Sequence, residues 1–179
     1  MRRLIDRERL LRFMRELGRA ARGEARVYLA GGSSAVLLEW RPTTIDIDLE
    51  IRPESDDVLR AIPRLKEELE VNVELASPGH FIPELPGWES RSPFIGREGP
   101  LWFHHYDFYA QALAKIERSH TRDLLDVRAI HELGLVEPGR LMELFASIEP
   151  QLYRYPAIDP RSFRTAVEET VAELGRSEN

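Results

Sequence analysis

The chain has 179 residues, of which 42% are hydrophobic and 31% are charged, so it can bury an ordinary globular core. It contains no cysteine, which excludes disulfides, cysteine-based zinc sites and thiol catalysis. The net charge of -6 argues against a broad nucleic-acid surface, although a local basic patch is compatible with it. There is no long apolar run of the kind that spans a membrane and no signal-peptide pattern, so we expect a cytoplasmic protein with no membrane partner.

Helix and strand patterns alternate in the first part of the chain. Apolar residues at helical spacing predict an amphipathic helix over residues 6–21, with Asp6 as its N-cap. A short apolar run at 27–30 predicts a buried strand, and residues 33–40 predict a helix of about two turns. Strict alternation over residues 45–51 is the clearest strand signal in the chain.

The next segments are punctuated by proline. Residues 56–69 read as a helix that Pro63 kinks or breaks, and 71–75 as a strand. Five prolines make residues 76–100 loop or irregular structure, with one short strand at most. Residues 101–103 are expected to form an edge strand.

From residue 106 onward the pattern is helical. The predicted helices cover 106–118, 120–133, 138–148 and 160–174. The sequence therefore predicts an α+β protein, with a mixed sheet and helices in residues 1–105 and a helical region, 106–179, packed on that core without a flexible linker.

Two acids stand out on the predicted strand 45–51. Asp46 and Asp48 are two residues apart, so their side chains point to the same face, with Cα atoms about 6.5–7 Å apart. The residues between and beside them are expected to face a core: Ile45, Ile47, Leu49 and Ile51. Such a pair can bind Mg²⁺ or Mn²⁺ ions, which bridge and activate nucleotide phosphates. The alternative is that Asp46, Asp48 and Glu50 form the wet face of a half-buried strand.

A glycine-rich turn precedes this strand. Gly31-Gly32-Ser33 joins the strand at 27–30 to the helix at 33–40. Glycines let the backbone approach a phosphate, a helix N-terminus offers free N–H groups, and Ser33 adds a hydroxyl. The turn is neither a P-loop nor a dinucleotide fingerprint, because no Gly-Lys-Ser/Thr follows and the third glycine is missing. The alternative is an ordinary tight strand-to-helix turn.

Together, the glycine turn and the acid–apolar–acid strand follow the order and spacing of a known signature. The segments Tyr28–Ser33 and Thr43–Leu49 resemble nucleotidyltransferase-like proteins related to abortive-infection toxins of the AbiEii/MenT kind. A second match lies at Lys115 and at Arg122-Asp123-x-x-Asp126. The resemblance implies the nucleotidyltransferase fold, Mg²⁺, a nucleoside triphosphate donor, a tRNA end or protein hydroxyl as acceptor, and a cognate antitoxin as partner.

The third carboxylate of the site has two candidates. Glu74, on the predicted strand 71–75, has the chain order that the fold requires, whereas Asp123 comes from the toxin-like motif. Glu74 is equally compatible with a solvated strand position, and Asp123 with a helix-dipole role. We expect Asp126 to be structural, paired with Arg122 or anchoring its helix.

Lys115 is one of only two lysines among 25 basic residues. It lies on an otherwise apolar helix, where it either neutralises triphosphate charge or is a surface lysine with a buried stem. The adjacent His104 and His105 would face opposite ways on a strand, which disfavours a shared zinc ion.

The leading hypothesis is a nucleotidyltransferase that moves a nucleoside monophosphate to an acceptor and releases pyrophosphate. Asp46 and Asp48 would hold the metals, and Gly31-Gly32-Ser33 would contact the phosphates. Lys115 would neutralise the negative charge of these phosphates. The first alternative is a non-catalytic nucleotide- or partner-binding module with the same fold. A weaker one is a metal-dependent nuclease, which the glycine turn disfavours.

Overall fold

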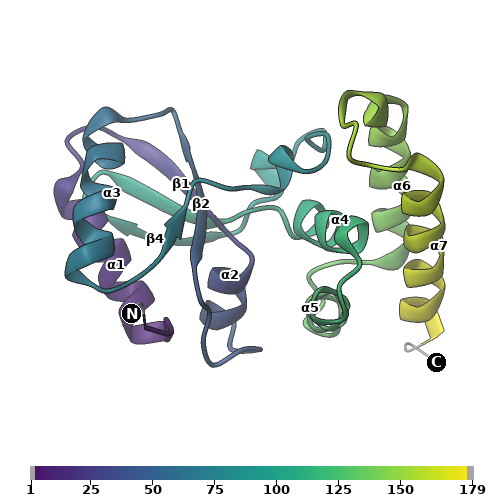
Figure 1. The fold of residues 1–179 in the computed structure, drawn as a ribbon, viewed down its shortest axis with the longest axis horizontal. Coiled ribbons are helices and arrows are strands. Elements are labelled where there is room, and N and C mark those ends of the chain that lie inside the picture. Colours follow the sequence, from purple (N-terminus) through teal and green to yellow (C-terminus); the bar gives the residue numbers. More distant parts are fainter. Residues whose placement is uncertain (1–2, 177–179) are drawn as a thin grey trace. The chain divides into compact units, whose positions relative to one another are not determined.

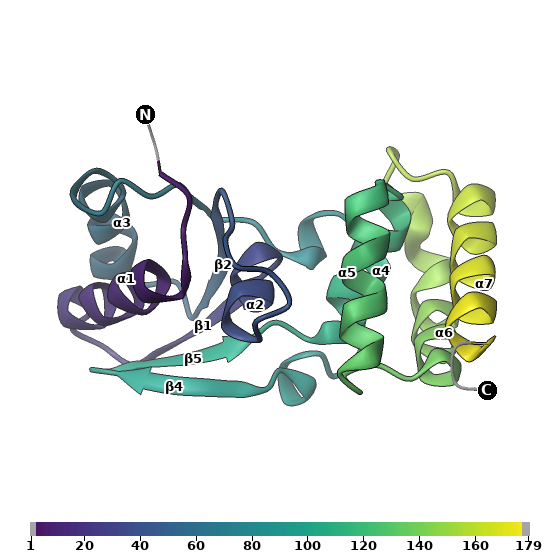
Figure 2. The ribbon, with the colours of Figure 1, turned by 90° about the horizontal axis from the view of Figure 1, so that it is seen from below.

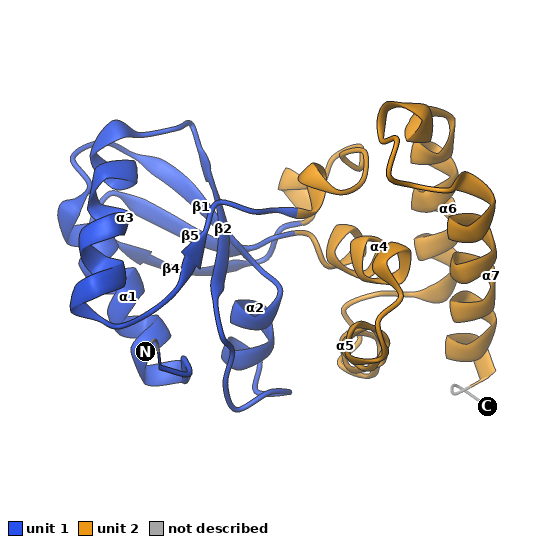
Figure 3. Ribbon diagram, viewed as in Figure 1, with its two compact units in different colours: residues 1–77, 92–106 blue, residues 78–91, 107–179 orange. Residues whose placement is uncertain are grey.

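The computed structural model describes residues 3–176 and has an α+β fold (Figure 1). A five-stranded mixed sheet with helices occupies the first half of the chain, and the second half is mostly helical. The chain divides into two compact units: residues 1–77 with 92–106, and residues 78–91 with 107–179 (Figure 3). One boundary lies next to the expected division at 105/106, but residues 78–91 belong to the helical unit. No helix within the described part of the chain is long and apolar enough to cross a membrane.

The sheet lies in the first unit, with strand order β3-β2-β1-β5-β4. The strands are β1 (Ala25–Ala30), β2 (Ile47–Arg52), β3 (Val73–Glu74), β4 (Phe94–Glu98) and β5 (Leu101–His105). β1 pairs antiparallel with β2 and parallel with β5, while β2–β3 is parallel and β4–β5 antiparallel. The strands predicted at residues 27–30 and 45–51 correspond to β1 and β2, which are neighbours in this sheet.

Two strand predictions are wrong in detail. β5 is an interior strand between β1 and β4, whereas residues 101–103 were expected at an edge. The true edge is β4, a strand inside the proline-rich segment; Pro93 and Pro100 flank it rather than interrupt it. Ile45 is 63% exposed, not buried, because β2 begins only at Ile47 and the preceding chain forms a single bridge between Thr44 and Ile5.

Helices α1 (Arg7–Ala20) and α3 (Asp56–Glu68) lie on one face of the sheet (Figure 2). As predicted, Asp6 caps α1: its Oδ1 accepts a hydrogen bond from the Arg9 N–H at 2.9 Å. The core between helices and sheet contains alternate strand residues and the apolar stripes of both helices, among them Val27, Leu49, Phe103, Phe13 and Leu65. A third helix, α2 (Gly32–Leu37), follows β1 and is shorter than expected.

Because strand side chains alternate, the remaining strand residues point to the opposite face, which we call the open face of the sheet. It carries Arg26 and Tyr28 from β1, their β2 partners Arg52 and Glu50, and their β5 partners Trp102 and His104. This face therefore collects the polar and aromatic side chains that the helix-covered face excludes.

The second unit consists of helices. These are α4 (Phe108–Arg118), α5 (Thr121–Glu132), α6 (Pro138–Ile148) and α7 (Pro160–Arg176), with a 3-10 helix, η3 (Glu149–Arg154), before α7. All four predicted helices are present. Two short 3-10 turns, η1 (Pro78–His80) and η2 (Glu89–Arg91), complete the unit.

Residues 78–91 are held to the helices by two polar links. The Arg91 guanidinium donates hydrogen bonds of 2.6 and 3.1 Å to Oδ2 of buried Asp107, and the Tyr155 hydroxyl donates to the Gly79 carbonyl at 3.0 Å. Burial raises the pKa of Asp107, although Arg91 acts in the opposite direction. Sequence patterns do not reveal these links, because their partners are far apart in the chain.

Candidate metal centre

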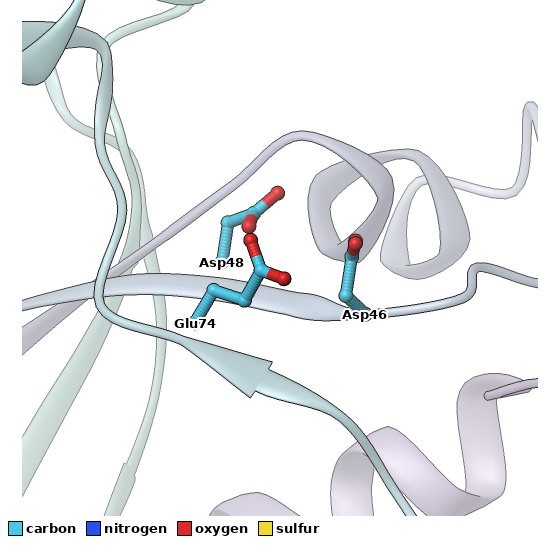
Figure 4. A group of neighbouring side chains, drawn as sticks. All are labelled: Asp46, Asp48 and Glu74. Atoms are coloured by element: carbon cyan, nitrogen blue, oxygen red, sulfur yellow. The ribbon is translucent and has the colours of Figure 1, made fainter. Parts of the chain in front are cut away.

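Three carboxylates of the first unit converge on one point. Asp46, Asp48 and Glu74 each offer one oxygen, and these oxygens all lie within 4.8 Å of one another. Figure 4 shows the three side chains projecting to the same side of β2 and β3. Asp46 and Asp48 are partly buried and Glu74 is exposed, so the cluster is open to solvent.

The sheet register explains this convergence. Asp48 lies on β2 and pairs with Glu74 on the parallel strand β3, which places both side chains on the open face. Ile47 and Leu49 are fully buried on the other face, so the strand cannot rotate without losing core contacts. Asp46 lies just before β2 yet keeps its side chain beside that of Asp48.

The geometry suits a hard divalent cation. Carboxylate oxygens are the ligands that Mg²⁺, Mn²⁺ and Ca²⁺ prefer. Two oxygens bound to one Mg²⁺ at about 2.1 Å are at most about 4.2 Å apart. The upper limit of 4.8 Å in the cluster therefore requires a closure of less than about 1 Å, which is within the range of small side-chain rotations.

The glycine turn lies against this cluster. A Cβ atom on Gly31 would lie 2.8 Å from Asp48 Oδ2, and Gly31 has a φ of +59°, in the region that favours glycine. A Cβ on Gly32 would overlap Thr44 Oγ1, at 1.9 Å. Both glycines are thus required for the close approach of the turn to residues 44–48, and the backbone at Gly31 borders the carboxylates directly.

The Ser33 side chain points into the protein interior, whereas its predicted role as a phosphate ligand needs an accessible hydroxyl. Its side chain is fully buried, and its Oγ has no hydrogen-bond partner among the described residues. Helix α2, whose second residue it is, has only six residues. Contact between the Ser33 hydroxyl and a phosphate stays a prediction, and in this conformation solvent does not reach the oxygen.

Two further residues support the acids and had no role in the sequence-based prediction. The Thr44 hydroxyl donates to the Asp46 carbonyl at 3.2 Å, and the Asn72 amide donates to Glu74 Oε1 at 3.1 Å. Asn72 is two residues before Glu74, so strand alternation could have placed it on the same face. Thr44 had no such signal, because its contact with the glycine turn is set by the fold.

Comparison with known proteins gave no match. No protein-family model, curated protein sequence or solved structure is similar to this chain.

The other predicted site residues lie in the second unit. The Lys115 ammonium contacts Asp126 Oδ2 at 2.7 Å and Asp123 Oδ1 at 3.5 Å, and the Arg118 guanidinium donates to both Asp123 oxygens, at 2.7 and 2.9 Å. Lys115 is 6% exposed, so it is not a surface lysine. Asp126 was expected to pair with Arg122 or to anchor its helix, and the structure pairs it with Lys115 of α4, which anchors α5. We call these four residues the α4–α5 ion network.

The charges in this network are balanced. Burial alone would raise the pKa of Asp123, but hydrogen bonds from Arg118 and the charge of Lys115 hold it below its ordinary value. Both Asp123 and Asp126 are buried, with exposed fractions of 5% and 3%. The network can fasten α4 to α5, and it lies in a different unit from Asp46, Asp48 and Glu74.

The two histidines face opposite sides of β5, as strand alternation predicts. His105 is buried, its Nδ1 lies 2.9 Å from Ser34 Oγ on α2, and burial lowers its pKa to about 4, with a smaller contribution from His104. His104 points to the open face, where its ring centroid is 5.4 Å from that of Tyr28. The neutral His105 side chain links β5 to α2, the helix that follows the glycine turn.

Proposed function

We propose that this chain is a metal-dependent nucleotidyltransferase with the nucleotidyltransferase fold. The observation that carries the proposal is the convergence of Asp46, Asp48 and Glu74 within 4.8 Å beside the Gly31 turn. Three carboxylates at the end of two parallel strands, bordered by the partly buried Gly31 backbone, form an arrangement that can hold a divalent cation and admit a triphosphate.

In this proposal the carboxylates and the glycine turn have separate roles. Asp46, Asp48 and Glu74 would hold Mg²⁺ or Mn²⁺, which when bound neutralises phosphate charge and lowers the pKa of a coordinated hydroxyl. The Gly31-Gly32 turn has no Cβ atoms, which lets its backbone approach Asp48 and Thr44 closely, and the Gly31 backbone would lie beside phosphates bound at the carboxylates. The carboxylates fix the position at which the acceptor oxygen meets the α-phosphorus.

The proposed reaction conserves the phosphate groups. An acceptor hydroxyl oxygen forms a bond to the α-phosphorus of a nucleoside triphosphate, and the bond from that phosphorus to the bridging oxygen breaks. Pyrophosphate leaves with the bonding electrons, and the hydroxyl proton passes to solvent, directly or through the exposed Glu74 carboxylate.

We assign the third carboxylate to Glu74 rather than Asp123. Glu74 converges with the aspartate pair, whereas both oxygens of Asp123 accept hydrogen bonds from Arg118. Lys115, held by Asp126 and Asp123, is assigned to the stability of the α4–α5 ion network. The resemblance to the toxins supplies the rest of the proposal: a tRNA end or a protein hydroxyl as acceptor, and an antitoxin as partner.

The test is transfer from each of the four nucleoside triphosphates labelled at the α-phosphate. The protein is incubated with the label, Mg²⁺ or Mn²⁺, and total bacterial RNA or protein as acceptor. We expect wild type to label one of these fractions and Asp48→Asn to label neither. Glu50→Gln, which changes the next acid on the same strand face, should still transfer. Absence of transfer from all four triphosphates would contradict the proposal.

A second function is favoured by the state of Lys115, Asp123 and Ser33. The first two are engaged in buried ion pairs, and the Ser33 hydroxyl is shielded from solvent. A protein that keeps the fold and binds a nucleotide or a partner without catalysis would show this pattern. Metal-dependent triphosphate binding without transfer would identify this second function.

A further inference from the structure

An exposed aromatic surface covers the β4–β5 end of the open face. Phe94 is 55% exposed and Trp102 is 37% exposed, and their ring centroids are 5.8 Å apart. The His104 ring lies 5.5 Å from that of Phe94 and 5.4 Å from that of buried Tyr28. Large aromatic rings at solvent-exposed strand positions are unusual, and here two of them, Phe94 and Trp102, continue into half-buried His104 and buried Tyr28.

Arginines accompany these rings. The Arg97 guanidinium lies over the Trp102 ring, 4.7 Å from its centroid, and exposed Arg26 is the register partner of Trp102 on β1. Arg97 also forms an exposed ion pair of 3.5 Å with Glu24, which is worth little in water. We call Arg26, Phe94, Arg97, Trp102 and His104 the aromatic–arginine face.

This surface shares the open face with the candidate metal centre. Trp102 is level with Arg52 of β2, two strands away, and Asp48 lies four residues from Arg52 along β2. Strand spacings of about 4.8 Å and rises of about 3.3 Å per residue put Trp102 about 16 Å from Asp48. His104 and Tyr28 lie between them, level with Glu50. A few nucleotides of single strand can cover this distance.

We propose that the aromatic–arginine face binds single-stranded nucleic acid and directs its end toward Asp46, Asp48 and Glu74. Unpaired bases stack on Trp102 and Phe94, and Arg26 and Arg97 contact the phosphates. The role of this strand as acceptor rests on the proposed function; the binding does not. The occupant is single-stranded because a duplex buries the base faces that stacking requires.

Charge restricts the site to a small patch. The protein as a whole carries a net charge of -6, so binding is confined to the face where the two arginines lie beside exposed rings. Stacking on aromatic rings tolerates any base, and the surface accordingly fits RNA or DNA of mixed sequence.

The experiment measures fluorescence anisotropy of a labelled single strand of about 12 nucleotides, as RNA, as DNA and annealed into a duplex. We expect wild type to bind the single strands more tightly than the duplex. Trp102→Ala should weaken binding about tenfold, Phe94→Ala should weaken it similarly, and Trp102→Phe should retain most of it. Arg26→Ala should lower the slope of log affinity against log salt by about 0.7.

The matched control is Tyr153→Ala. Tyr153 is 73% exposed in the second unit and also lies beneath an arginine, Arg154, at 5.6 Å, so it reproduces the chemistry of the Trp102–Arg97 pair elsewhere. This variant should bind like wild type. The inference would be overturned if wild type bound duplex and single strand with equal affinity. It would also be overturned if Trp102→Ala and Phe94→Ala both bound with wild-type affinity, or if the protein bound a protein acceptor but no oligonucleotide.

The outcome is separable from that of the proposed function. If metal-dependent transfer occurs but oligonucleotides do not bind, the surface inference fails alone. If oligonucleotides bind as described and no transfer occurs, the surface stands and the transferase proposal fails. The RNA and DNA arms then decide which strand the face prefers.

Discussion

The candidate metal centre and the α4–α5 ion network both gather aspartates, but they arrange them in opposite ways. In the first unit, three acids approach one another at a partly exposed position. In the second, two buried acids each contact a cation, Lys115 or Arg118. Converging carboxylates can share one bound cation, whereas the buried network is balanced by its own lysine and arginine. The signature Lys115-x7-Asp123-x2-Asp126 can therefore serve packing, while the strand acids suit a ligand.

The largest effect is expected from breaking the buried network. Asp126→Asn removes the 2.7 Å partner of Lys115 and leaves a buried ammonium near Asp123 only. We expect a loss of about 3 kcal/mol in the free energy of unfolding, measured by urea denaturation. Glu143→Gln, which breaks the exposed pair with Arg140, should cost less than about 0.5 kcal/mol. Similar small losses in both variants would remove the distinction between the two regions.

A smaller effect on the free energy of unfolding is expected from His105, which is buried in its neutral form, unlike the charged acids of the α4–α5 ion network. The pKa of His105 is lowered from 6.5 to about 4 by burial, so the unfolded chain binds more protons than the folded protein between these values. Stability should therefore fall as the pH is lowered from 6.5 toward 4, by about 2.5 kcal/mol from this residue. The measurement is the pH dependence of urea unfolding in wild type and His105→Gln.

In His105→Gln this part of the pH dependence should disappear, because glutamine can still bond to Ser34 Oγ but does not titrate. His120→Gln changes an exposed histidine without a capping bond and should keep the wild-type profile. Parallel profiles for His105→Gln and wild type would show that His105 is protonated in the folded protein.

Elements with strong local periodicity could be predicted from the sequence. Helix α1 and strand β2 follow from apolar spacing, because one face of each is buried in the same core. Alternation also placed Asp46 and Asp48 on one face. The same rule failed for Ile45, since alternation cannot tell where a strand begins. β4 is the one short strand that residues 76–100 were allowed, but the prolines around it hid its position.

Features that depend on pairing between distant segments could not be predicted. The interior position of β5 results from its register with β1, about 75 residues earlier in the chain. Glu74 was one of two candidates until the β2–β3 pairing set it opposite Asp48. The burial of Lys115 and its contact with Asp126 arise from the packing of α4 on α5, which helical periodicity does not specify.

The most direct test of the central claim is a melting scan with and without Mg²⁺ or Mn²⁺. If Asp46, Asp48 and Glu74 hold a divalent ion, metal at ten times its Kd should stabilise wild type by about 1.4 kcal/mol, a rise of a few degrees in Tm. Asp48→Asn should lose this rise, whereas Glu50→Gln, which is paired with Arg52, should keep it. A Tm of wild type that is unchanged by either metal, even with added triphosphate, would contradict the account.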